Sequence, residues 1–426
     1  MNTRPADSLQ PLVLQARESG KAGRTAESAQ LWERVLQLNG DHAEALLALS
    51  TQALARRDAQ GALGLLARAA QANPRDPMIQ LYIALANKEL GQVEAESTAI
   101  TRALSIDPYF YPALLHRGML LERLGKRRQA AKIFRDVLKI MPSQDKLAPG
   151  FQRAVTHAEG AVRENQDALE KHLEGVLGGL RRQHAGARLD RFERSLQVMI
   201  GRKKMYAPEP VMLHYADLPP IQFYDDDLFP WMAQLEAATD LIRDELRGVL
   251  AESREEFRPY IQYPAGAPVN QWQELNQSPR WSTYFLWQHG VRDEAHCERC
   301  PGTARVLESL PLARLPNFSP TAMFSCLEPR TVIPPHTGET NTRLIVHLPL
   351  IVPPNCTFRV GHETRPWQYG KAFVFDDSIE HEARNDSDEL RVVLIFDVWN
   401  PNLSPVEREL VAALVNGVRD YYRAED

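Results

Sequence analysis

The sequence is short of cysteine, of long apolar runs and of any excess of one charge. Four cysteines in 426 residues are too few for a disulfide framework and are typical of a reducing compartment. No stretch approaches the roughly eighteen apolar residues of a membrane span, and the N-terminus lacks a basic segment followed by an apolar one. We therefore expect no export and no membrane span, and we expect a cytoplasmic protein.

Positive and negative charges almost balance, with 50 Lys and Arg against 55 Asp and Glu, for a net charge of -5. Proteins that bind nucleic acid through bulk charge carry a basic excess, so we predict no nucleic-acid partner. An apolar content of 44% excludes a disordered chain, and the length suffices for two or three domains.

A 34-residue period runs through the first third of the chain. Small residues recur at Ala16, Ser50, Ala84 and Gly118. Helix-ending residues recur at Gly40, Pro74, Pro108 and Pro142. Turn residues recur at Gly23, Gly91 and Gly125, with Arg57 in the slot where glycine is missing. A small residue lets two helices approach closely, glycine forms the turn and proline stops the second helix. The period predicts antiparallel helix pairs and resembles tetratricopeptide repeats, about four of them across residues 7–142.

We divide the chain into a repeat array (1–145), a helical linker (146–205) and a β-rich domain (206–426). The array has two interpretations: a concave surface that binds a protein or peptide partner, which we favour, or a scaffold without a ligand. In the linker an apolar stripe is formed by Val162, Leu169, Leu173, Val176 and Leu180. The basic run that follows, from Arg181 to Lys204, fits a phosphate-binding face or a solvated one. Two acids, Asp190 and Glu193, interrupt it and favour the solvated face.

From Tyr206 onward aromatic residues and proline become frequent, and long helical periods give way to short β-rich runs. We expect one amphipathic helix over 231–251. Strands are then expected at 281–288, 321–328, 342–351, 356–361, 371–376 and 390–399. Many short strands without intervening helices predict an antiparallel jelly roll. The expected fold class is therefore multidomain α + β, an N-terminal α-solenoid followed by a double-stranded β-helix of cupin-like type.

Two histidines stand beside strand-like segments. His336 follows a diproline, and His381 comes 45 residues later, directly after a strand. Neutral imidazoles on facing strand ends suit Fe, Zn, Cu or Ni, and the spacing alone does not choose among them. A facial triad would add a carboxylate two residues after the first histidine, where this chain has Gly338.

Arginine also occurs inside apolar strands. Arg391 follows His381 by ten residues, and a buried guanidinium there requires an anion, which its planar fork can bind in a bidentate way. Arg343 and His347 lie four residues apart in another strand, so their side chains point to the same face. These residues predict a cavity that holds a metal and a carboxylate.

The segments PPHTGETNTRLIVHLPL, WQYGKAFVFDDSIEHEARN and LRVVLIFDVWNPNLSP resemble the aspartyl/asparaginyl β-hydroxylases, which are Fe(II)- and 2-oxoglutarate-dependent dioxygenases. The resemblance covers roughly residues 206–410. It implies that His336 and His381 bind Fe(II) and that Arg391 binds the distal carboxylate of 2-oxoglutarate. It further implies that Ser325 helps to hold this co-substrate and that His347 lies near its other carboxylate.

The sequence departs from the family at Ile345, where relatives often carry an arginine, and Arg343 is the candidate replacement. Glycine at position 338 is the family's habit, and it implies water or substrate in the vacant coordination position. Asp376, Asp377 and Glu339 are alternative third ligands, although we expect Asp377 to cap or orient the loop before His381.

The resemblance implies hydroxylation of an aspartyl or asparaginyl side chain in a protein or peptide, with O2 and 2-oxoglutarate consumed and succinate released. The repeats would recruit the target. One alternative keeps the chemistry but acts on a lipid or small metabolite. Another is a non-catalytic repeat scaffold with a degenerate barrel.

A compact HCxxC stands at His296, Cys297 and Cys300. It fits either part of a zinc site or a loop feature with a conditional disulfide. Because a structural zinc site takes four ligands and the chain has no second CxxC, we favour the loop.

Overall fold

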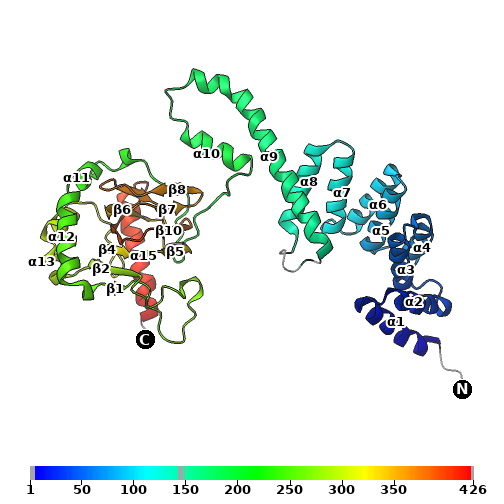
Figure 1. Ribbon diagram of the computed structural model, residues 1–426. Coiled ribbons are helices and arrows are strands. Elements are labelled where there is room, and N and C mark those ends of the chain that lie inside the picture. The colour runs from blue at the N-terminus through cyan, green and yellow to red at the C-terminus, as the bar shows by residue number, and fades with distance from the viewer. Residues whose placement is uncertain (1–4, 143–146, 148, 424–426) are drawn as a thin grey trace. The chain divides into compact units, whose positions relative to one another are not determined.

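The computed structural model describes residues 5–142, 147 and 149–423 (Figure 1). The chain forms two compact units, Met1–Ile200 and Gly201–Asp426, and each is described by itself. The expected boundary between array and linker, at residues 145 and 146, lies outside the described residues. No described helix is long and apolar enough to cross a lipid bilayer.

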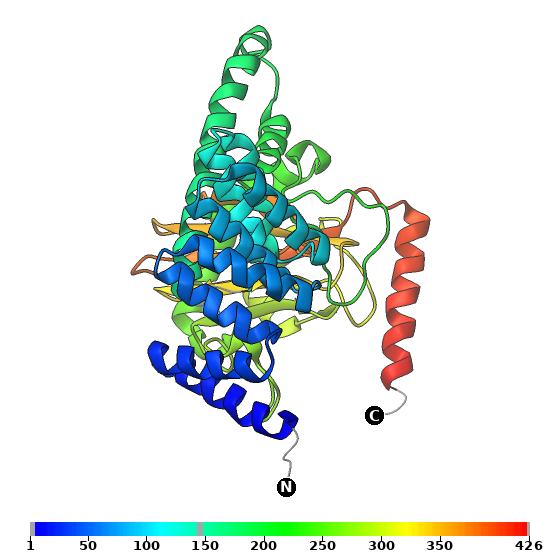
Figure 2. The ribbon, with the colours of Figure 1, turned by 90° about the vertical axis from the view of Figure 1, so that its right-hand side faces the viewer.

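The first unit begins with helices that stack as antiparallel pairs (Figures 1 and 2). The pairs are α1 (Pro5–Lys21) with α2 (Thr25–Leu38), α3 (Ala43–Ala55) with α4 (Ala59–Ala72), α5 (Pro77–Glu89) with α6 (Val93–Ile106), and α7 (Tyr111–Arg123) with α8 (Arg127–Ile140). The predicted array of tetratricopeptide-like repeats is thereby confirmed.

The residues that carry the period have the conformations that it requires. Gly23, Gly91 and Gly125 all adopt positive φ angles at the turns, and Arg57 takes the same left-handed conformation with φ 63°. In the fourth pair, a Cβ added at Gly118 would lie 2.2 Å from the ring of Phe134. The small residue is therefore where two helices of a pair approach most closely.

The next helix, α9 (Pro149–Gln183), continues the array at its start. Phe151, Ala158 and Val162 of α9 join the apolar cluster around Phe134 of α8. Further along, the predicted apolar stripe turns to solvent. The following helix, α10 (Asp190–Met199), has no buried residue at all. The predicted linker is therefore packed at its start, and Ile200, directly after α10, is buried again.

The second unit is built on two antiparallel sheets. The larger sheet has the order β1-β2-β4-β11-β6-β9, with β3 paired to β2, and the smaller has the order β5-β10-β7-β8. The strands are β1 (Arg258–Pro259), β2 (Trp281–Gln288), β3 (Val291–Arg292), β4 (Ala322–Leu327), β5 (Thr331–His336), β6 (Arg343–Ile351), β7 (Cys356–Val360), β8 (Glu363–Pro366), β9 (Phe373–Phe375), β10 (His381–Asn385) and β11 (Arg391–Trp399). The architecture is that of the predicted jelly roll.

Helices pack against the larger sheet and share its core. They are α11 (Met232–Ala237), α12 (Thr239–Glu252), α13 (Glu294–Arg299) and α14 (Pro301–Glu308). Leu235, Ile242 and Leu307 from these helices join Phe324 and Leu394 from the sheet in one buried cluster. The prediction of a single helix over 231–251 is wrong in one respect, because a break at Ala238 divides it. The expectation that no helices separate the strands is also wrong, since α13 and α14 do so.

The last helix, α15 (Pro405–Arg423), lies on the outside of the jelly roll and is red in Figures 1 and 2. Val411 and Val415 bury its inner side against Phe318 and Leu315. Short 3-10 turns are formed by η2 (Asp226–Leu228), η3 (Arg254–Glu256) and η4 (Asn270–Trp272).

Candidate active site

Side chains from both sheets of the second unit line one cavity of about 290 Å³. All six predicted site residues lie on its wall, namely Ser325, His336, Arg343, His347, His381 and Arg391. They come from strands β4, β5, β6, β10 and β11. The jelly roll therefore brings together residues that are up to 66 positions apart in the sequence.

The two histidines face each other across paired strands. His336 of β5 is in register with His381 of β10, and their ring centroids are 4.1 Å apart. The Nδ1 atom of His336 lies 2.8 Å from the carbonyl oxygen of Pro334, and that of His381 lies 3.0 Å from the carbonyl oxygen of Ile379. A carbonyl oxygen only accepts, so each Nδ1 carries the hydrogen. Each Nε2 therefore keeps the lone pair that a metal requires.

Burial favours the neutral form of both rings. Burial lowers the pKa of His336. It lowers the pKa of His381 well below its usual value, and the neighbouring His336 contributes a smaller lowering. A neutral imidazole with a fixed tautomer is the form that can bind a divalent metal, so the protonation state and tautomer of both rings are compatible with metal binding.

The glycine two residues after the first histidine has a steric cause. A Cβ added at Gly338 would lie 2.0 Å from Oδ2 of Asp377, so a side chain there would require the carboxyl group of Asp377 to move. Among the described residues, no group of three His, Cys, Asp or Glu side chains is placed to hold a metal. Asp376, Asp377 and Glu339 therefore do not complete a triad in this geometry.

The loop before the second histidine is held by Asp376, not by the side chain of Asp377 as predicted. Oδ1 of Asp376 accepts hydrogen bonds from the amide of Ser378 at 3.0 Å and from its hydroxyl at 2.5 Å. Asp377 contributes its backbone carbonyl, which accepts from the amide of Gly338 at 2.6 Å. Its carboxyl group faces the cavity, and burial raises the pKa of Asp377 to about 7, although Arg343 opposes this shift.

Arg391 is a buried cation that lacks a carboxylate partner among the described residues. Only 1% of its surface is exposed, its guanidinium lies 4.6 Å from the ring centroid of Trp367, and its Nε makes no hydrogen bond. Burial lowers the pKa of Arg391 to about 10, so it remains charged at neutral pH. Because an unpaired buried charge is costly, this arrangement indicates an anionic ligand in the cavity.

Two neighbours of Arg391 also have hydrogen-bonding capacity to spare. Ser325 accepts a hydrogen bond from Nε1 of Trp281 at 3.1 Å, which leaves its own hydroxyl hydrogen available to an acceptor. Nδ1 of the buried His347 has no partner, and burial followed by the charge of Arg391 lowers the pKa of this histidine well below its usual value. Ser325, His347 and Arg391 together fit a ligand that carries carboxylates.

Arg343 differs from Arg391 because acids already surround it. Its guanidinium lies 3.4 Å from a carboxyl oxygen of Asp397 and 3.9 Å from one of Asp377. Its Nε has no hydrogen-bond partner, so one side of the fork is still available to a ligand. The charge of Arg343 is therefore compensated by nearby carboxyl groups, whereas that of Arg391 has no such compensation among the described residues.

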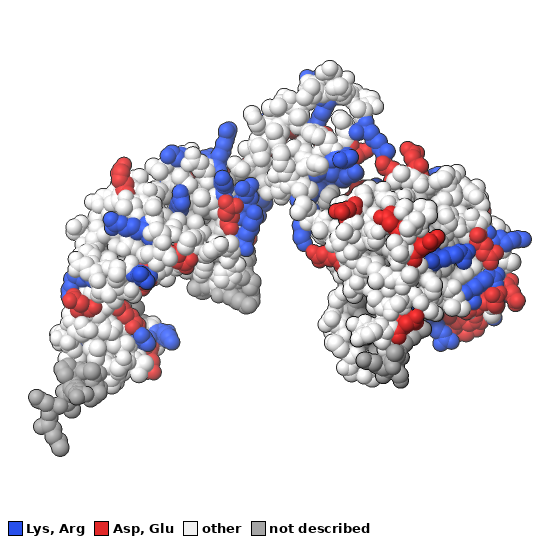
Figure 3. Space-filling view, turned by 180° about the vertical axis from the view of Figure 1, so that it is seen from behind, with Lys and Arg blue, Asp and Glu red and all other residues white. Residues whose placement is uncertain are grey.

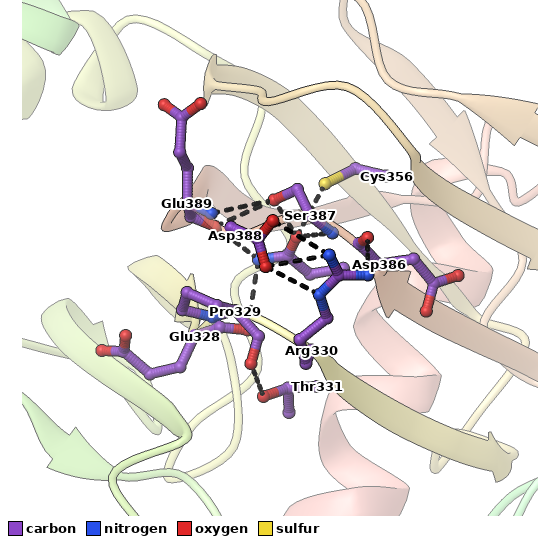
Figure 4. A network of polar contacts seen from close by, with 10 residues as sticks. Glu328, Pro329, Arg330, Thr331, Cys356, Asp386, Ser387, Asp388 and Glu389 are labelled. Atoms are coloured by element: carbon purple, nitrogen blue, oxygen red, sulfur yellow. Dashed lines mark hydrogen bonds and ion pairs between the residues drawn. The ribbon is translucent and has the colours of Figure 1, made fainter.

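A network of polar contacts holds the turn between β10 and β11, shortly before Arg391 (Figure 4). The sequence pattern had not singled out this turn. The buried side chain of Asn385 donates to the carbonyl oxygens of Leu327, Glu328 and Glu389. Arg330 makes two hydrogen bonds of 2.9 Å to the carboxylate of Asp388. The Asn-Asp-Ser-Asp segment shortly before the apolar strand β11 was the available signal of a rigid turn.

The HCxxC motif lies apart from this cavity. His296 and Cys297 lie in helix α13 and Cys300 is the C-cap of that helix, so the loop interpretation is wrong. Nδ1 of His296 bonds to the carbonyl oxygen of Phe285 at 2.6 Å, and Nε2 lies 3.1 Å from a carboxyl oxygen of Glu256. Cys297 and Cys300 are buried free thiols. Both nitrogens of the histidine are occupied, which leaves no zinc site here.

Comparisons with known proteins bear directly on this cavity. Residues 236–401 match the family model "Aspartyl/Asparaginyl beta-hydroxylase", a range that includes all six predicted site residues. An ornithine lipid ester-linked acyl 2-hydroxylase from Rhizobium tropici is 40% identical over 202 residues, which cover 46% of this chain and 67% of the relative. The chain belongs to the aspartyl/asparaginyl β-hydroxylase family. The resemblance noted from the sequence is thereby confirmed, and the family relationship supports an oxygenase enzyme.

Other β-hydroxylase family members match more of the chain. The human aspartyl/asparaginyl beta-hydroxylase is 30% identical over 319 residues, which cover 70% of this chain and 39% of the human protein. The chain thus spans about two fifths of the length of this relative. Among solved structures, a tetratricopeptide-repeat protein of Thermus thermophilus aligns with 45% of this chain and 99% of its own, at 20% identity and a TM-score of 0.32.

Proposed function

We propose that this β-hydroxylase family member is an Fe(II)- and 2-oxoglutarate-dependent dioxygenase. In the proposed reaction it hydroxylates an aspartyl or asparaginyl side chain of a protein or peptide. The observation that carries the proposal is the buried, unbalanced charge of Arg391 in the same cavity as two neutral histidines with free Nε2 atoms. One residue set thus fits a divalent metal and the other fits a dicarboxylate.

The donor set suits ferrous ion and leaves room for exchangeable ligands. His336 and His381 would hold the metal through Nε2, and Gly338 leaves the position of the usual carboxylate open to water. Bound Fe(II) would supply activation of O2, coupled to conversion of 2-oxoglutarate into succinate and CO2 while the second oxygen atom enters a substrate C–H bond.

The other residues would bind and orient the co-substrate. A bidentate contact from Arg391, with a hydrogen bond from Ser325, would hold the distal carboxylate. His347 and Arg343 would receive the carboxylate nearer the metal, with Arg343 in place of the arginine that is missing at position 345. Phe358 and Phe375 pack around His347 with ring centroids 4.9 and 5.0 Å away, and so keep water from the reacting atoms.

The repeat array supports a protein or peptide as the substrate. Stacked helix pairs of this kind form an extended surface that commonly binds other proteins, and recruitment by the array would raise the local concentration of the target.

A lipid is the second candidate substrate, with the same chemistry. It is favoured by the 40% identity to a relative named as a lipid acyl hydroxylase. A non-catalytic scaffold fits less well, because a degenerate barrel has no reason to keep a desolvated guanidinium beside two oriented histidines.

The chemistry is tested by succinate release from 2-oxoglutarate with added Fe(II). We expect turnover in the parent chain and none above background in His336→Ala. The matched control is His172→Ala, an exposed histidine of α9, which should behave as the parent. Equal signals in the parent and in His336→Ala would refute the proposal. Mass spectrometry for a gain of one oxygen, in candidate peptides against ornithine lipids, then separates the two substrate classes.

A further inference from the structure

Helix α10 has an apolar face that its own unit covers only in part. Phe192, Leu196 and Met199 follow one another at helical spacing and lie within about 60° of the helix circumference. Phe192 is 46% exposed and Met199 is 64% exposed. An isolated helix of ten residues is marginal in water, so a further surface that covers this apolar face would add to the stability of α10.

The end of α9 presents a second apolar surface of the same kind. Val176 and Leu180 are 59% and 56% exposed, and they continue the stripe that is packed at its start. A hydrogen bond of 3.2 Å from Gln197 to Glu170 and an ion pair between Arg181 and Glu193 join the two helices. We call the segment from Val176 to Ile200 the α9–α10 hairpin.

Positive charge exceeds negative charge on this hairpin. Residues 176–200 contain five Arg and two Asp or Glu, a local net charge of +3 in a chain whose total is -5. Arg191 borders the apolar face of α10 and is exposed. On the other border Glu193 is paired with Arg181, so its negative charge is compensated. In Figure 3 Lys and Arg side chains gather over this part of the first unit, with uncharged surface between them.

A small cavity at the base of the hairpin has the same character. Its volume is about 170 Å³. The apolar residues Val162, Leu169 and Met199 line it, together with the cations Arg128 and Lys132 of α8. Apolar walls beside cations suit a ligand with an apolar part and an anionic part.

We propose that the α9–α10 hairpin is a docking surface for an anionic lipid membrane, on which it lies without crossing. Apolar side chains enter the boundary between headgroups and acyl chains, and the basic residues remain among the anionic headgroups. A second copy of the same face is disfavoured, because a two-fold contact would bring two segments of net charge +3 together.

Membrane docking is independent of the proposed chemistry, since it requires neither iron nor 2-oxoglutarate. Its test is co-sedimentation of the full chain with vesicles of phosphatidylcholine alone or of phosphatidylcholine with phosphatidylglycerol, without metal or co-substrate. We expect binding only to the anionic vesicles and weaker binding at high salt.

Two variants separate the apolar and the charged contributions. Phe192→Ser with Met199→Ser should weaken vesicle binding by at least about tenfold. Arg191→Gln should weaken it about fivefold. Because α10 has no buried residue, these changes leave the fold of the unit intact. The matched control is Leu410→Ser with Leu414→Ser on α15, two apolar residues of similar exposure, which should bind as the parent does.

The proposal fails if the parent chain stays in solution with anionic vesicles, or if the Phe192 and Met199 variant binds as tightly as the parent. It also fails if the parent instead binds a single-stranded oligonucleotide or an acidic peptide through these residues. Gel filtration provides a further check, because a parent dimer that Phe192→Ser with Met199→Ser converts to a monomer would assign the face to a second copy.

Discussion

Replacing Arg391 by methionine should weaken the binding of 2-oxoglutarate with little effect on the binding of the metal. Methionine fills much of the same volume, so the apolar surroundings stay packed while the charge is removed. The side chain is 1% exposed and its Nε is unpartnered, so in the parent it is free to make a charge-assisted bidentate contact to a carboxylate.

The expected magnitude follows from that burial. A charge-assisted hydrogen-bonded contact contributes about 1.5–3 kcal/mol, which corresponds to roughly 10- to 150-fold in affinity. The free protein should not lose stability, because removal of an unpaired buried charge lifts a desolvation penalty. Arg391→Met should therefore unfold at or above the temperature of the parent when no ligand is present.

The assay is calorimetric titration of 2-oxoglutarate into protein loaded with Mn(II), which avoids turnover. Arg384→Met is the matched control, because Arg384 lies on the neighbouring strand β10 but is exposed and paired with Asp386. It should bind as the parent does. An unchanged affinity in Arg391→Met would show that the guanidinium does not contact the co-substrate, and the reasoning from its burial would be refuted.

Three further changes test the surroundings of the site and the array. Gly338→Ala should clash with Asp377, cost about 1–3 kcal/mol of stability and weaken iron binding; unaltered iron binding in equilibrium dialysis would contradict the steric argument. Asn385→Ala should lower the free energy of unfolding by about 2–4 kcal/mol, because three carbonyl groups lose the donor that the buried Asn385 supplies; a loss below 1 kcal/mol in urea titration would be inconsistent with that network. Burial lowers the pKa of His116 in the folded array, although the charge of Glu96 opposes this shift. Below about pH 6.5 the unfolded chain therefore binds a proton more readily than the folded one, and the array should lose stability as the pH falls. His116→Gln should reduce that slope in melts monitored by circular dichroism, and an identical slope would assign it to other groups.

The parts of the fold that follow regular patterns could be predicted from the sequence. The 34-residue period was sufficient to predict the helix pairs. Each small residue in the period lies where two helices approach closely, and each turn residue has a backbone conformation that the turn requires. The apolar strands β2, β4, β6, β7, β9 and β11 lie within two residues of their expected bounds. These strands are rich in β-branched or aromatic residues, so they can be recognised from the sequence alone.

The strands that carry the histidines were not predicted. Strand β5 ends in Pro334 and Pro335 before His336, and proline ordinarily argues against a strand. Strand β10 reads HEARN, which is too polar to suggest a buried element. Both strands belong to the smaller sheet and carry polar residues that line the cavity. The alternation of apolar and polar residues that identifies a strand packed on the core is therefore missing in them.

The pairing of Arg343 also depends on three-dimensional contacts. From its strand alone it looked like Arg391, an arginine among apolar neighbours. Only the register of β6 with β11, which sets Ile345 opposite Asp397, brings a carboxylate within 3.4 Å of Arg343. Local periodicity gives no information about a carboxylate 54 residues away in the sequence. The sequence alone therefore could not show that Arg343 has an acidic partner and Arg391 has none.

The central claim is that two imidazoles hold ferrous ion without a carboxylate ligand. Anaerobic equilibrium dialysis against Fe(II), on the parent, His381→Ala and Asp377→Asn, tests it most directly. The account predicts one iron per chain in the parent and in Asp377→Asn, and loss of bound iron in His381→Ala. If Asp377→Asn loses its iron as completely as His381→Ala does, a carboxylate ligand is required and the two-histidine site is contradicted.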